Sequence, residues 1–169
     1  MPTYAKTTTV TVDKSRAEIE HTLLRYGASS FMYGYDREMA AVGFVLNGRQ
    51  IRFTLPLPPR DDDAFWYTEV KRRKRSHEQA LALWEQACRQ RWRALSLVIK
   101  AKLEAVEAGI ATVEDEFLAY TALPNGDTVS DWLGPQIERV YQTGLMPSML
   151  PMLSSGNDAE IVEGDVLAD

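Results

Sequence analysis

The chain has 169 residues, of which 45% are hydrophobic and 25% are charged, a composition typical of one globular domain. One cysteine excludes an intramolecular disulfide, and one cysteine with two histidines cannot build a zinc cluster. The first residues lack a secretion signal, and no apolar run approaches the roughly 18 residues of a membrane span, so we expect a soluble, cytoplasmic protein without membrane contact.

Charge is distributed unevenly, although the net charge is only −5. Residues 1–108 carry 18 basic and 13 acidic side chains, whereas residues 109–169 carry 1 and 11. The first part is therefore +5 and the second −10. This asymmetry indicates either a basic surface separate from an acidic one, or an acidic tail that shields a basic face until a partner displaces it.

A strand and a helix are predicted first. The β-branched run TTTVTV favours a strand, and DKSRAEIEHTLLRYGA, which follows, has apolar residues at helical spacing. Ser15 and Glu18 have the spacing of a capping box at the start of this helix. Gly27 stands where a left-handed residue would end it.

A β-hairpin is predicted next, because an Asn-Gly pair at positions 47–48 separates two alternating segments. Such a pair favours a two-residue type I′ turn. The turn places Phe44 opposite Ile51, and Val42 opposite Phe53, on one buried face.

Three aromatic residues alternate on a strand before this hairpin, namely Phe31, Tyr33 and Tyr35. They could form a stacking platform like those of single-strand binders. Same-face aromatic residues more often pack beneath a helix, and the opposite face, with Met32 and Gly34, is only weakly apolar. We therefore predict that the aromatic face belongs to the core.

A long amphipathic helix is predicted after Ser76, which is placed to cap it. Its apolar residues recur every 3.6 positions or so, which gives one continuous stripe. The stripe consists of Leu81, Trp84, Cys88, Trp92, Leu95, Ile99, Leu103 and Val106. A helix over residues 77–108 would be about 48 Å long. It would project past a small sheet, and its surplus apolar surface would suit a homodimer.

Shorter helices are predicted after Gly109 ends the long one. Thr112 is placed to cap a short acidic helix, and PNGD at 124–127 predicts a turn. A last helix is broken or started by Gly134 and Pro135.

Together these elements predict an α+β fold with a small antiparallel sheet, an N-terminal helix, one long amphipathic helix and a C-terminal helical subdomain. We expect a single domain over residues 1–146. Residues 147–169 combine Pro, Ser and Gly with acids and show little periodicity, so we expect an acidic, mobile tail.

Three stretches of the chain are AVGFVLNGRQIRFTLPLP, QRWRALSLVIKAKLEAVEAGIATVEDEFLAY and LPNGDTVSDWLGPQIERVYQTGLMP. They cover more than half of it and resemble a group of small proteins encoded by bacteriophages, notably phages of actinobacteria. The resemblance implies a phage-encoded protein in the host cytoplasm. It implies no reaction, cofactor or site.

The most distinctive local feature is a run of five consecutive cations directly before the long helix, here called the basic run. It comprises Lys71, Arg72, Arg73, Lys74 and Arg75. Cations are disfavoured at the positive end of a helix dipole, so the run does not serve helix stability. It could bind nucleic-acid phosphates, with Trp66 and Tyr67 upstream offering faces for stacking bases. The alternative is a solvated loop offset by the acids at 61–63.

Basic residues on the long helix could extend this surface. Arg89 and Arg93 lie four residues apart on one side, flanking Trp92, and Lys100 continues near the same azimuth. The alternative is that their long stems cover the edges of the apolar stripe while their charged heads reach water.

No catalytic, cofactor or metal site is predicted. Neither His21 nor His77 has an arrangement of carboxylates near it in sequence that would mark a triad, and Cys88 lies inside the apolar stripe, where a thiol is usually inert. The acids at 61–63 are consecutive and point in different directions, and those at 114–116 suit the first turn of a helix.

Two functions from different classes follow. The first is a non-enzymatic accessory protein that binds DNA or RNA through the basic run, Arg89, Arg93 and Lys100. The second is a protein-binding inhibitor or adaptor that acts on a host defence or transcription complex. It would use the exposed end of the long helix, or the acidic segment 158–169 as a mimic of nucleic acid.

Overall fold

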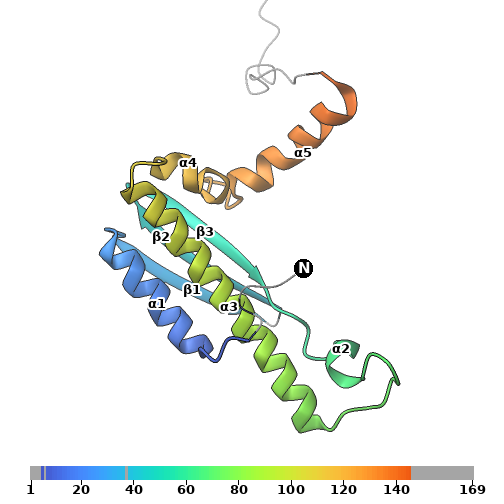
Figure 1. Cartoon of the computed structure of the whole chain (residues 1–169). Coiled ribbons are helices and arrows are strands. Elements are labelled where there is room, and N and C mark those ends of the chain that lie inside the picture. Colours follow the sequence, from blue (N-terminus) through green and yellow to red (C-terminus); the bar gives the residue numbers. More distant parts are fainter. Residues whose placement is uncertain (1–4, 6, 37, 146–169) are drawn as a thin grey trace, which may run out of the picture. The chain divides into compact units, whose positions relative to one another are not determined.

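The computed structural model describes residue 5, residues 7–36 and residues 38–145. Within them the chain forms a three-stranded antiparallel sheet and five α-helices, so the α+β prediction is confirmed (Figure 1). The chain divides into two units, Met1–Trp132 and Leu133–Asp169. The predicted acidic tail at 147–169 lies outside the described residues, and the predicted boundary at 146 stays a prediction.

Helix α1 spans Val12–Arg25 and begins earlier than its predicted cap. The Thr11 hydroxyl caps it by accepting from the N–H of Lys14 at 3.2 Å, so the capping box expected at Ser15 is wrong. Ser15 is buried inside the helix instead. The strand expected over TTTVTV is also wrong, because this short run pairs with no strand in the described ranges and its end already belongs to α1.

The sheet confirms the predicted hairpin and its register. Its strands are β1 (Ser30–Asp36), β2 (Met39–Leu46) and β3 (Arg49–Pro56), in the order β1-β2-β3. The Asn-Gly pair at 47–48 has positive φ at both residues, as a two-residue turn requires. Phe44 pairs with Ile51, and Val42 with Phe53, and all four are buried.

The aromatic face of β1 is only partly core, which corrects the prediction. The register places Phe31 and Tyr33 on the same face as Phe44 and Val42. Phe31 packs against the core, but the exposed fractions of Tyr33 and Tyr35 are 47% and 62%. Tyr33 and Tyr35 are exposed because β1 is an edge strand, where fewer core residues cover the sheet. The guanidinium of Arg16 lies 3.6 Å from the centre of the Tyr33 ring.

Helix α3, His77–Glu107, matches the predicted long helix. A capping box of Ser76 and Gln79 starts it, and Gly109, at φ 70°, follows its end. Its buried residues are Ala80, Cys88, Trp92, Leu95, Ser96, Ile99 and Leu103. Together α1 and α3 lie side by side on one face of the sheet (Figure 1).

Helix α4 spans Val113–Phe117, and the 3₁₀ helix η1 spans Leu118–Tyr120. Both pack against this core. Phe117 meets the rings of Phe44 and Phe53 edge-on, at centroid distances of 5.9 and 6.2 Å. Helix α5, Val129–Thr143, runs through Pro135, so the break expected there is wrong.

Thr112 caps α4 as predicted, and its contact with Asp115 makes stability depend on pH. Hydrogen bonds from the Thr112 hydroxyl and N–H hold the pKa of Asp115 below its ordinary value of 3.8. Their stabilisation is complete above that value and is lost as pH falls through the lower folded-state pKa. We therefore expect Asp115→Asn to flatten the acid limb of stability against pH, as measured by urea unfolding. An unchanged limb would contradict this.

None of the helices in the described ranges is long and apolar enough to cross a membrane.

Candidate nucleic-acid interface

The basic run lies at one end of a loop that hydrogen bonds close. A short helix, α2, spans Asp63–Trp66 and packs beside the N-terminal part of α3 (Figure 1). It leads into the segment 66–75, here called the basic loop. The N–H of Arg75 donates to the carbonyl of Trp66 at 2.7 Å, and Tyr67 and Lys74 form a β-bridge.

Further bonds close the tip of the basic loop. The N–H groups of Thr68 and Arg72 donate to the carbonyls of Arg73 and Thr68, each at 3.0 Å. The N–H of Arg73 also donates to the Thr68 hydroxyl at 3.0 Å. The loop is therefore held by its own main chain, with a shape that does not depend on a bound partner.

Arg75 is a structural member of the basic run. Its guanidinium donates to the carbonyl oxygens of Ala64 at 2.9 Å and Phe65 at 3.0 Å, and also to that of Tyr67. These acceptors lie in and just after α2, whose last carbonyls lack helical partners. Arg75 therefore ties the loop to α2, and its charge is directed inward.

Arg72 has an internal carboxylate partner. It forms an ion pair with Asp63 at 3.2 Å, and its guanidinium lies 5.9 Å from the Tyr67 ring centre. Both members of the pair are exposed, so the pair contributes little stability. The φ of Arg72 is 43°, in the left-handed region that is uncommon for a residue with a Cβ. This conformation turns the chain at the loop tip.

The remaining cations of the basic run are Lys71, Arg73 and Lys74. All three are exposed, and within the described ranges their side chains make no hydrogen bond or ion pair. Val70, beside them, is 90% exposed. Thr68, Glu69, Val70, Lys71, Arg73 and Arg75 line a hollow of about 370 Å³. These three charges are therefore available to an external anion.

The structure does not join the helix cations to the basic loop. Arg93 forms an ion pair with Glu18 of α1. The guanidinium of Arg89 donates to the side-chain oxygen of Gln86 at 2.7 Å and lies 3.8 Å from the carboxylate of Glu85. Lys100 is exposed, but it lies 24 residues beyond Ser76, about 36 Å along the helix axis. One contiguous basic face is not formed.

The predicted stacking residues are partly used within the fold. Both are half-buried. The indole N–H of Trp66 donates to the Arg60 carbonyl at 3.1 Å, and its ring lies 5.6 Å from that of His77. Trp66 also lines a cavity of about 790 Å³ together with one cation, Arg60, and three carboxylates, those of Asp36, Glu38 and Asp61. The net negative charge of this lining disfavours phosphate, so the interface is confined to the loop tip.

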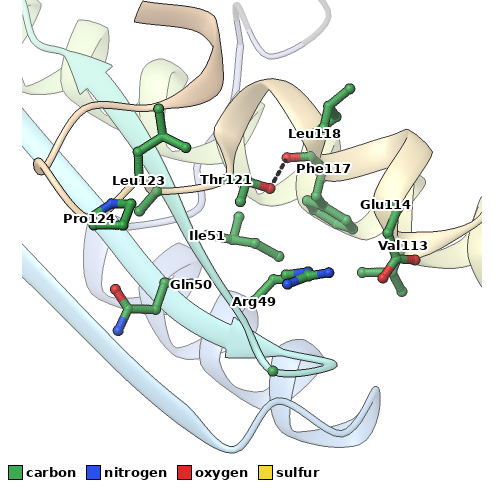
Figure 2. Close-up of a pocket in the computed structure, with 12 residues that line it drawn as sticks. Arg49, Gln50, Ile51, Val113, Glu114, Phe117, Leu118, Thr121, Leu123 and Pro124 are labelled. Carbon is green, nitrogen blue, oxygen red and sulfur yellow. Dashed lines mark hydrogen bonds between the residues drawn. The ribbon is translucent and has the colours of Figure 1, made fainter. Parts of the chain in front are cut away.

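A second cavity, of about 610 Å³, opens between β3 and the α4–η1 segment (Figure 2). Ile51 and Phe117 are among its apolar lining residues, while Arg49 comes from β3 and Glu114 from α4. One cation and one carboxylate give this lining no net preference for an anion. Sequence analysis did not detect it, because its walls are far apart in the chain.

Cys88, which sequence analysis placed inside the apolar stripe, is buried in α3. Desolvation raises the pKa of its thiol, which disfavours the reactive thiolate.

Comparison with known proteins adds no relative, because no family model, curated protein or solved structure matches the chain.

Proposed function

We propose that this chain is a non-enzymatic accessory protein of bacteriophage type that binds nucleic acid in the host cytoplasm through its basic loop. The observation that carries the proposal is the set of three exposed cations, Lys71, Arg73 and Lys74, on a loop held by hydrogen bonds within the chain. A preordered loop loses little conformational entropy on binding. Three clustered charges without partners among the described residues suit a phosphate backbone.

The proposal assigns different roles within the basic run. Lys71, Arg73 and Lys74 would contact phosphates, while Arg75 positions the loop and Arg72 shapes its tip. Phosphate contacts carry no sequence information, so binding would be general and strongly salt-dependent. Arg89 and Arg93 are left out of this interface, because each has a partner within the fold.

The test is a salt series with the full chain and the triple variant K71A/R73A/K74A. Fluorescence anisotropy would measure affinity for labelled single- and double-stranded DNA and RNA. We expect the variant to bind at least tenfold more weakly at low salt, because about three ionic contacts are lost. The slope of log K against log salt should also become shallower by between two and three.

A matched control removes the same charge elsewhere. The variant K14A/R49A/R91A takes three exposed cations from α1, β3 and α3, and so changes the net charge equally. It should bind almost as the unmodified chain does. The proposal fails if no nucleic acid binds at low salt, or if the two triple variants lose affinity equally.

A second candidate, the protein-binding inhibitor or adaptor, is favoured by α5. This helix has an apolar stripe that includes Leu133, Ile137 and Tyr141, four residues apart, and none of its residues is buried. A 15-residue helix is only marginally stable alone in water, so such a stripe calls for a cover. A stoichiometric protein retained after nuclease treatment, together with no affinity in the salt series, would favour this candidate.

A further inference from the structure

Strand β1 forms an edge of the sheet at which no other described strand pairs with it. The opposite edge is partly covered, because Ile51 of β3 bridges to Thr121 and the N–H of Ala122 donates to the Gln50 carbonyl at 2.8 Å. No such bridge reaches Phe31 or Tyr33 from any residue that the structure describes.

The ladder pattern fixes which main-chain groups of β1 face outward. In a two-residue hairpin the residues that flank the turn bond each other, and bonded and non-bonded pairs then alternate. Starting from the turn at 47–48, this alternation directs the N–H and C=O of Phe31 and Tyr33 away from β2. The bond from Ala122 to Gln50 supports the assignment, because the same alternation directs the Gln50 carbonyl outward.

The side chains of β1 give this edge little protection. Folded proteins usually shield an open edge with Lys, Pro or a bulge, and β1 has none of these. Its only charged residue is Asp36, at its end. Met32 is 73% exposed and Tyr33 47% exposed. Such an edge is suited to pairing with another strand.

We propose that the occupant of this edge is β1 of a second copy, paired antiparallel about a twofold axis at Tyr33. Tyr33 is the midpoint of Ser30–Asp36, so full overlap of two such strands places Tyr33 opposite its own copy. The two three-stranded sheets then join into one sheet of six strands. The interface is isologous and closes at two chains.

The strand is complementary to itself in this register. Phe31 lies opposite Tyr35 of the second copy, and aromatic cross-strand pairs are favourable. Met32 lies opposite Gly34, which has no side chain, so the large side chain of Met32 has room there. Asp36 lies opposite Ser30, so no like charges oppose each other directly. This interface differs from the predicted homodimer, which relied on the long helix.

Disulfide trapping tests the register directly. The variant Tyr33→Cys is made in a Cys88→Ala background, which leaves one thiol per chain. Directly opposed residues have Cα atoms about 4.5–5.5 Å apart, within the range of about 4.4–6.8 Å that a disulfide spans. We expect mild oxidation to link the chains covalently. Tyr35→Cys in the same background is the control, because its two copies would lie about 13 Å apart.

The mass of the unmodified chain, measured by light scattering over a dilution series, should be that of two chains. The Tyr33→Lys variant should have the mass of one chain, because two lysines of like charge would then face each other at the twofold axis. Circular dichroism would check that this variant folds. The proposal is overturned if the unmodified chain is monomeric throughout, or if the Tyr35→Cys variant cross-links as readily as the Tyr33→Cys variant.

Discussion

Replacing Phe117 with alanine is expected to lower the free energy of unfolding by about 4 kcal/mol. The side chain is 1% exposed and joins α4 to the sheet through the rings of Phe44 and Phe53. Removing it costs the transfer free energy of the ring and leaves a cavity that the surrounding strands cannot fill. Urea unfolding would measure the change.

The neighbouring residue supplies the control for this prediction. Leu118 is 55% exposed, and Leu118→Ala should change the free energy of unfolding by no more than about 0.5 kcal/mol. Phe117→Leu keeps most of the volume and should cost about 1.5 kcal/mol, which retains a readout if the alanine variant does not fold. Equal losses for Phe117→Ala and Leu118→Ala would show that α4 does not belong to the core.

Replacing Arg75 with alanine is expected to open the basic loop without unfolding the core. The substitution removes the donor to the carbonyls of Ala64, Phe65 and Tyr67. Even one hydrogen bond to a charged group contributes about 1.5–3 kcal/mol, so we expect local opening to become at least about tenfold more frequent. Amide hydrogen exchange at Thr68 and Arg73 would report it, because these N–H groups close the loop.

Two comparisons separate this positioning role from charge alone. Lys71→Ala removes the same charge from an exposed side chain and should leave the exchange rates of the basic loop nearly unchanged. Arg75→Lys keeps the charge but loses the planar fork, so its exchange rates should resemble those of Arg75→Ala. If Lys71→Ala and Arg75→Ala accelerate exchange equally, Arg75 does not hold the loop.

The elements predicted correctly from sequence are those with strong local signals. The Asn-Gly pair at 47–48 fixes a hairpin register by itself, and Ser76, Gly109 and a long 3.6-residue periodicity define α3. The strand expected over TTTVTV failed because β-branched residues form a strand only where a partner exists.

The candidate site was only partly predictable. The composition of the basic run marked the right segment, but a four-residue helix such as α2 has no periodicity to detect. The clamp from Arg75 to Ala64 spans eleven residues, and the ion pair between Arg93 and Glu18 spans 75. Sequence spacing does not encode such contacts, so the division of the cations into available and internally used ones required coordinates.

The length of α3 has an electrostatic consequence. Glu116 of α4 pairs with Lys102, which lies 26 residues beyond Ser76, so about 39 Å of the helix axis separates the basic loop from this carboxylate. Mobile ions at physiological salt screen charges over about 8 Å. A polyanion approaching the loop would therefore barely sense the acids at 114–116, so the overall negative charge of the chain is a poor guide to what its basic end attracts.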